Sequence, residues 1–155
     1  MHDAANDLNA CGIRCTPQRL EVYSALQRCL GHPTAEELHR LVTERRQARG
    51  EAGSVSLATV YNTLEALCGL GLARRLPGPR AGLSGAAECR AARYEAAGRE
   101  HYHAYTPDGS AHDIPEDLGR RMREAIPEEL LREFEARTGL RASRVVIEVE
   151  SDGAA

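Results

Sequence analysis

The sequence predicts an α+β protein, with an N-terminal winged helix-turn-helix domain over residues 1–97 and a small α/β dimerisation domain over residues 98–150. Three observations predict this fold class. The first 70 residues contain three capped, amphipathic helix patterns. Two strand patterns follow, at 72–76 and 92–97, and a hairpin after such helices is typical of a winged helix. Beyond them, short strand patterns alternate with two helix patterns in about 55 residues, too few for a stable separate core, so this half is expected to pair with a second copy.

Each helix in the first half has a start signal. Thr16-Pro17 combines a favourable N-cap with a proline at the first helical position, where no amide hydrogen is left unbonded. Thr34 and Glu37 have the spacing of a capping box, and Ser56 caps the third helix. The apolar positions expected to be buried in the first helix are Leu20, Tyr23, Leu26 and Leu30, with Gly31 ending it.

The third helix has an unusual exposed face. Small hydroxyl, amide and methyl groups occupy it where a solvated helix normally carries charge, and such groups suit base edges in the major groove of DNA. A face that packs on a partner protein is the alternative, and the preceding helix and short turn favour the helix-turn-helix. The apolar stripe is predicted as Leu57, Val60, Leu64, Leu67 and Cys68, and the opposite face as Ala58, Thr59, Asn62, Thr63 and Ala66, flanked by Tyr61.

The second half is predicted to contain strands at HYHAY and HDI, helices over 115–126 and 127–138, and a strand over 144–150. In the predicted wing, arginines suit either backbone phosphates or ordinary solvation. The apolar residues expected to face inward from the two helices are Leu118, Met122, Leu130, Leu131 and Phe134, and the wing arginines are Arg74, Arg75, Arg80, Arg90 and Arg93.

Composition narrows the function classes. The N-terminus has no signal-peptide pattern and no apolar run is long enough to span a membrane, so a cytoplasmic protein without a membrane partner is expected. Five cysteines without a CxxC pair do not suit a disulfide framework. Residues 1–96 carry 12 arginines against 10 acidic residues, whereas residues 97–155 carry 8 against 13. The mildly basic first half is therefore the part suited to phosphates.

A set of histidines and carboxylates points to a metal site. His101 and His103 lie two residues apart in an expected strand, so their side chains point to one side and can bind the same ion. Glu95 precedes the pair, and His32 lies far upstream in the predicted helix-turn-helix domain. An ion bound by all of them would join two parts of the chain. After the pair, His112 competes with Asp113, because adjacent strand residues face opposite ways.

Six short motifs in order resemble the ferric uptake regulator (Fur) family of metal-dependent transcription factors, and the resemblance covers residues 8–150. They are TPQR at 16–19, HPTAEEL at 32–38, SLATVYNTL at 56–64, RYE at 93–95, HYH at 101–103 and HDI at 112–114. The resemblance implies a homodimer of winged-helix subunits that represses transcription from an AT-rich palindrome in double-stranded DNA. It also implies one divalent ion per subunit, Fe, Mn or Zn, bound by His32, Glu95, His101, His103 and Asp113.

The resemblance further implies that Thr59, Tyr61 and Asn62 contact bases and that Arg14 enters the minor groove. No structural zinc with four cysteine ligands is expected, because the chain lacks the CxxC pairs of many relatives. Two branches are most similar: the haem-responsive iron response regulator (Irr) branch and the peroxide-sensing (PerR) branch, so haem is an alternative ligand. A mononuclear metal enzyme is the competing class, but no nucleophile, phosphate loop or cofactor fingerprint accompanies the histidines, and no enzyme is expected.

Overall fold

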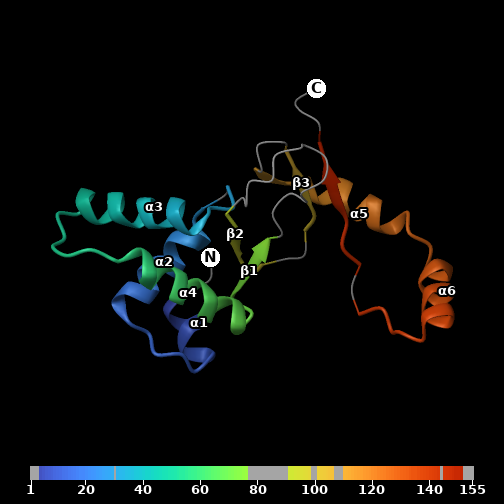
Figure 1. Cartoon of the computed structure of the whole chain (residues 1–155), viewed down its shortest axis with the longest axis horizontal. Coiled ribbons are helices and arrows are strands. Elements are labelled where there is room, and N and C mark those ends of the chain that lie inside the picture. Colours follow the sequence, from blue (N-terminus) through green and yellow to red (C-terminus); the bar gives the residue numbers. More distant parts are fainter. Residues whose placement is uncertain are drawn as a thin grey trace. The chain divides into compact units, whose positions relative to one another are not determined.

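The computed structural model describes residues 4–29, 31–76, 91–98, 101–106, 110–143 and 145–151. They divide into two compact units, residues 1–98 and residues 99–155. In Figure 1 the first unit runs from blue to yellow and the second from yellow to red. Within these ranges no helix combines the length and apolar content needed to cross a bilayer.

The first unit is built from helices that pack on one another and from a two-stranded antiparallel sheet. Side-chain oxygens of Thr16, Thr34 and Ser56 each accept a backbone N–H of the helix that follows, and Glu37 completes the expected capping box. These helix starts are therefore confirmed. The elements are α1 (Ala4–Ala10), α2 (Pro17–Gln27), α3 (Ala35–Ala48), α4 (Leu57–Gly69), β1 (Ala73–Leu76) and β2 (Arg93–Ala96).

A single apolar cluster holds this unit together. The helices α2, α3 and α4 contact one another pairwise, and α1 lies against α2. Each fully buried leucine contributes about 1.5–3 kcal/mol relative to an exposed one, so the cluster makes a large contribution to the unit's stability. Its largest fully buried side chains are Leu8, Leu26, Leu38, Leu64, Leu67, Val22, Val42, Val55 and Val60.

Three details of the first unit differ from the sequence predictions. Helix α1 was not predicted, because its short, polar sequence buries only Ala4 and Leu8. Helix α2 ends at Gln27 and not near Gly31, since the N–H of the C-cap residue bonds to carbonyls of the last turn; Leu30 lies outside the described residues. On α4, Thr63 is buried and Leu57 is exposed, contrary to the predicted faces.

The second unit contains a three-stranded sheet in the order β4-β3-β5 and two helices that lie between β4 and β5 in the chain. Strand β3 pairs antiparallel with β4 and parallel with β5. The backbone N–H of Thr106 donates to the carbonyl of Ser110 at 3.0 Å, which joins the end of β3 to the start of β4. The elements are β3 (His103–Tyr105), β4 (Ala111–Asp113), α5 (Glu116–Glu124), α6 (Glu128–Thr138) and β5 (Glu148–Glu150).

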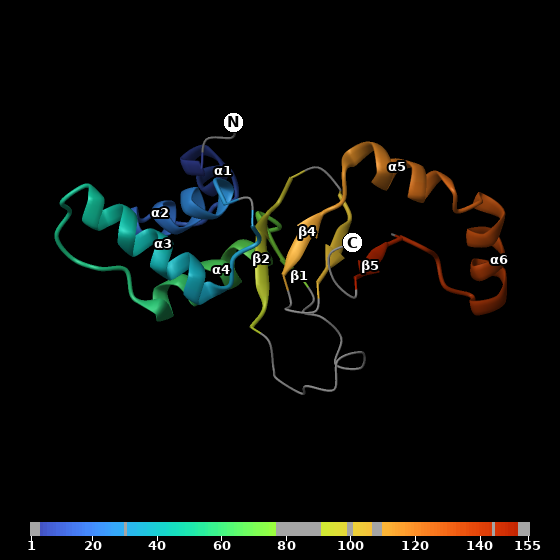
Figure 2. The same ribbon diagram turned by 90° about the horizontal axis from the view of Figure 1, so that it is seen from above.

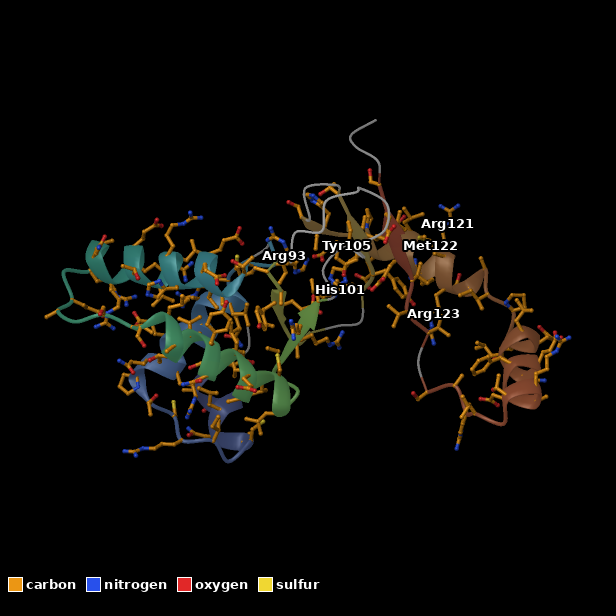
Figure 3. The ribbon with its side chains drawn as sticks, in the orientation of Figure 1. Arg93, His101, Tyr105, Arg121, Met122 and Arg123 are labelled. Carbon is orange, nitrogen blue, oxygen red and sulfur yellow. The ribbon has the colours of Figure 1, made fainter. Side chains whose placement is uncertain are left out.

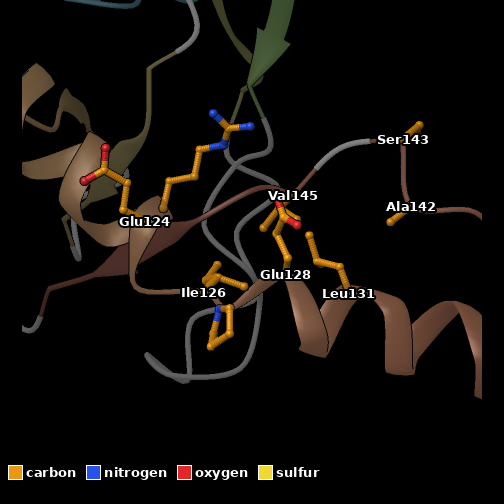
Figure 4. Close-up of a pocket in the computed structure, with 9 residues that line it drawn as sticks. Glu124, Ile126, Glu128, Leu131, Ala142, Ser143 and Val145 are labelled. Carbon is orange, nitrogen blue, oxygen red and sulfur yellow. The ribbon is translucent and has the colours of Figure 1, made fainter.

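The helices of this unit leave apolar side chains uncovered in the single chain. Figure 2 shows α5 and α6 as consecutive helices joined by a short turn. Of the residues predicted to face inward, Met122 and Leu131 are half-buried. The prediction is wrong in the single chain for Leu118, Leu130 and Phe134, which are 42%, 56% and 44% exposed. A pocket of about 460 Å³ (Figure 4) is lined in part by Ile126, Pro127, Leu131 and Val145.

Candidate metal centre

The first unit brings His32 next to Glu95. His32 lies in the loop between α2 and α3, and the backbone N–H of Tyr94 donates to the carbonyl of Pro33 at 3.0 Å, which fastens this loop to β2. His32 Nδ1 lies 3.8 Å from Glu95 Oε2, and both residues are almost fully buried, at 5% and 6% exposure. A buried carboxylate is costly unless a positive charge or hydrogen bonds compensate it, and Arg74 Nη1 lies 3.9 Å from Glu95 Oε1.

The second unit gathers His101, His103 and Asp113. His103 on β3 is the cross-strand partner of Asp113 on β4, so the two side chains lie on one face of the sheet. Asp113 Oδ1 lies 3.2 Å from His101 Nε2 and 3.6 Å from His103 Nε2, and the imidazole centroids are 4.6 Å apart. His112 instead pairs with Ala104 and is exposed. Of the two alternatives left by the sequence, Asp113 is therefore the residue that reaches the imidazoles.

The donor atoms suit a divalent first-row metal. Imidazole nitrogens with carboxylate oxygens are ligands for Fe, Mn and Zn, and the carboxylates offset the charge of the cation. The first unit offers one imidazole and one carboxylate, and the second unit offers two imidazoles and one carboxylate. The cysteines within the described ranges, Cys11, Cys15, Cys29 and Cys68, are free thiols, and Cys89 lies outside those ranges.

Tyr102, between the two histidines, is fixed from the other side. Its carbonyl accepts the N–H of Ile114 at 2.8 Å. Its ring lies against Gly119 of α5, where an added Cβ would stand 2.8 Å from Tyr102 Cδ2. Because successive residues of an extended segment face opposite ways, anchoring Tyr102 on α5 turns His101 and His103 towards Asp113.

The Gly119→Ala variant is expected to lose stability and metal affinity, although alanine is the better helix former by about 1 kcal/mol. The new methyl group must displace the Tyr102 ring, and overpacking of this kind costs roughly 1–3 kcal/mol. Urea denaturation and metal titration measure both effects. Gly69→Ala in α4 is the matched control, because no atom lies within 4 Å of its Cβ position; it should leave both quantities unchanged or raise stability.

The predicted DNA-contacting residues all lie in the first unit. Tyr61 and Asn62 are exposed on α4, Thr59 is half-buried near its N-terminus, and Arg14 is exposed in the loop before α2. The hydroxyl of Tyr61 donates to Glu36 Oε1 at 2.5 Å. This hydrogen bond raises the pKa of Tyr61 and lowers the pKa of Glu36, so the tyrosine is held as a neutral donor beside a carboxylate.

Sequence reasoning missed a charged network that fixes the turn before α4. Arg46 at the end of α3 donates to the carbonyls of Ala52 and Gly53 at 3.0 and 3.3 Å, and to Glu21 Oε2 of α2 at 2.6 Å. Arg49 also bonds to Glu21. Arginines near the end of a helix are common, so the sequence gives no sign that these two fix the turn; only their contacts with Glu21 of α2 show it.

The wing arginines are only partly open to a ligand. Arg93 binds the carbonyl of His32 and the carboxylate of Glu37, and Arg74 lies near Glu95, so these two are engaged within the unit. Arg80, predicted for the wing tip, and Arg90, predicted to flank it, lie outside the described residues.

Comparisons with known proteins agree with this geometry. The peroxide operon regulator of Bacillus subtilis strain 168 is 29% identical over 104 residues, which are 67% of this chain and 61% of that protein. The match thus spans less than two thirds of that relative. The ferric uptake regulator of Vibrio cholerae has a similar fold, with a TM-score of 0.64, 21% identity and coverage of 97% of this chain and 100% of that one. A zinc-bound manganese uptake regulator also has a similar fold, with a TM-score of 0.65, 22% identity and coverage of 97% of this chain and 98% of that one. The predicted fold class is thereby confirmed.

The sequence model described as the ferric uptake regulator family matches residues 10–133, which include every motif that carried the resemblance. Members of this family are metal-responsive transcription regulators and not enzymes. The chain belongs to the ferric uptake regulator family.

Proposed function

We propose that this protein is a metal-dependent repressor that binds double-stranded DNA as a homodimer in the cytoplasm. The observation that carries the proposal is the gathering of His101, His103 and Asp113 in a chain that also has a helix-turn-helix. A metal-responsive regulator needs both a surface that binds DNA and a group of residues that binds the metal. The exposed apolar residues of α5 and α6 support a second copy as the partner, because such side chains are normally buried in an interface.

One divalent ion per subunit is proposed to bind His32, Glu95, His101, His103 and Asp113 together. Only residues 96–100 separate Glu95 from His101, and six extended steps reach about 20 Å at most. The connecting residues therefore limit how far the donor group of the first unit can lie from that of the second. An ion with ligands in both units would supply the charge and coordination that restrict their relative motion, and so the spacing of the two α4 helices in a dimer.

Metal and DNA are then linked. If the metal-bound arrangement fits the operator better, DNA must tighten metal binding by the same factor as metal tightens DNA binding. Allosteric couplings of this kind are typically about 1–3 kcal/mol, which corresponds to roughly 5–150-fold. The donor set supports Fe, Mn or Zn. The relative named for peroxide regulation supports peroxide as a signal besides the metal itself.

On the DNA, α4 is proposed to enter the major groove of an AT-rich palindrome. Thr59, Tyr61 and Asn62 would contact base edges, and Arg14 the minor groove. The exposure of Tyr61 and Asn62 supports this assignment.

The test is DNA affinity measured with and without metal. Fluorescence anisotropy with a palindromic AT-rich duplex is expected to give about 5–150-fold tighter binding with Mn²⁺ than with a chelator, and weak binding to a scrambled duplex. Equal affinities with metal and with chelator would contradict the switch. Haem is the alternative ligand. If added haem, whose binding is followed by its absorption band, restores DNA binding without metal, this alternative is favoured.

A further inference from the structure

The backbone of His32 has an uncommon conformation. Its φ is 48°, and among the described residues it is the only non-glycine residue with a positive φ. Residues with a Cβ rarely occupy this left-handed region, and when they do the surrounding structure must hold them there. His32 is also a proposed metal ligand, so whatever holds its backbone also determines where its imidazole points.

Arg93 makes the contact that fits this role (Figure 3 labels it). Its Nη1 donates to the carbonyl oxygen of His32 at 2.9 Å and to Glu37 Oε2 at 3.1 Å. The Arg93 side chain is only 19% exposed, so these bonds are partly shielded from water. The backbone contributes as well, through an isolated bridge between Thr34 and Arg93.

Glu37 orients the guanidinium. The same oxygen, Oε2, accepts the backbone N–H of Thr34 at 2.9 Å in the capping box of α3. The carboxylate that binds Arg93 is therefore also bound to the start of α3. Through this chain of bonds, the helix start, the His32 loop and strand β2 share one anchor.

We infer that Arg93 is a positioning residue of the metal site, which holds His32 in its left-handed conformation and its imidazole next to Glu95. Arg93 and Glu95 are two residues apart on β2 and lie on the same side of the strand. The first binds the backbone of His32, and the second receives its ring, with Nδ1 at 3.8 Å from Oε2. Arg93 itself touches no metal and acts through His32, so this inference rests on the proposed metal function.

The test measures Co²⁺ affinity and the Co²⁺ ligand-field spectrum of the full chain, by competition with a chromophoric chelator. Arg93→Met keeps the unbranched stem and removes the donor. It is expected to weaken Co²⁺ binding about 10–100-fold, as loss of residues that orient metal ligands does, and to shift the spectrum. Arg93→Lys should recover part of the affinity, because both bonds come from a single nitrogen that an ammonium group can replace.

Arg46→Met is the matched control. Arg46 lies in the same unit, is buried to the same degree at 18% exposure and is also ion-paired, but its partners are Glu21 and the turn before α4. It should lower the melting temperature and leave Co²⁺ affinity and spectrum unchanged. If Arg93→Met does not fold, Glu37→Gln takes its place, because its amide oxygen still caps Thr34 while the charge that orients Arg93 is lost; it should weaken Co²⁺ binding.

The outcomes separate the two proposals. A wild-type chain that binds no Co²⁺ overturns the proposed metal function. A wild-type chain that binds Co²⁺ while Arg93→Met binds it equally well, with the same spectrum, overturns the positioning role alone. Loss of Co²⁺ affinity in both Arg93→Met and Arg46→Met, in proportion to their melting temperatures, also overturns it, because stability would then explain the effect.

Discussion

Replacing His103 with alanine is expected to abolish metal-dependent DNA binding. His103 is 8% exposed on β3, and its Nε2 lies 3.6 Å from Asp113 Oδ1. A metal-binding free energy of about 10–16 kcal/mol, shared among the five proposed ligands, gives about 2–3 kcal/mol for one ligand, or roughly 30–200-fold in affinity. At metal concentrations that saturate the wild type, the variant would remain largely metal-free and would bind DNA as the chelated wild type does.

The matched control for this variant is His112→Ala. His112 is the same residue type on the neighbouring strand, but it pairs with Ala104 and is exposed. Zn²⁺ titration and DNA anisotropy of both variants measure the difference. His112→Ala should match the wild type in both, and an equal loss in the two variants would show that His103 has no special place in the site.

Local signals made much of the fold predictable. Thr16, Thr34 and Ser56 cap helices in the structure as their side chains and spacing indicated, because N-capping depends on atoms within three residues. Over 145–149 the predicted alternation of burial persists, with Val145, Ile147 and Val149 less exposed than Val146 and Glu148, but the strand itself is shorter than the predicted 144–150 and covers only Glu148–Glu150. Strand period is a local property, so the sequence displays it directly.

Features that depend on distant contacts were not predictable. Helix α1 is held by Leu8 in the core and by Asp7, which accepts hydrogen bonds from Tyr23 and Gln27 on α2 at 3.2 Å each. The sequence predicted Thr63 on the polar face of the helix, but it lies in the same helical row as Val60 and Leu67 and is buried with them. In both cases a neighbouring helix decides burial, and the local pattern does not contain it.

The metal centre shows the same division. The two-residue spacing of His101 and His103 predicted that both imidazoles would face one side, and both reach Asp113. The choice between His112 and Asp113 required the register of β3 with β4. The role of Arg93 required a bond to a carbonyl 61 residues earlier in the chain, which no spacing rule encodes.

Replacing Leu64 with alanine is expected to lower the free energy of unfolding of the first unit by about 2–5 kcal/mol, the usual cost of a large-to-small substitution in a packed core. Leu64 is fully buried on α4, where α2 and α3 both contact the helix. Urea denaturation followed by far-ultraviolet circular dichroism measures the change.

Asn62→Ala is the control on the same helix, two residues away and exposed. A surface substitution of this kind changes stability by no more than about 0.5 kcal/mol, whereas loss of a base contact weakens DNA binding by about 1–3 kcal/mol. The two variants therefore separate the two faces of α4: Leu64→Ala should reduce stability, and Asn62→Ala should reduce DNA affinity at unchanged stability. If Asn62→Ala unfolds the protein as readily as Leu64→Ala, the exposed face of α4 is buried in the native dimer, and DNA must be read by another surface.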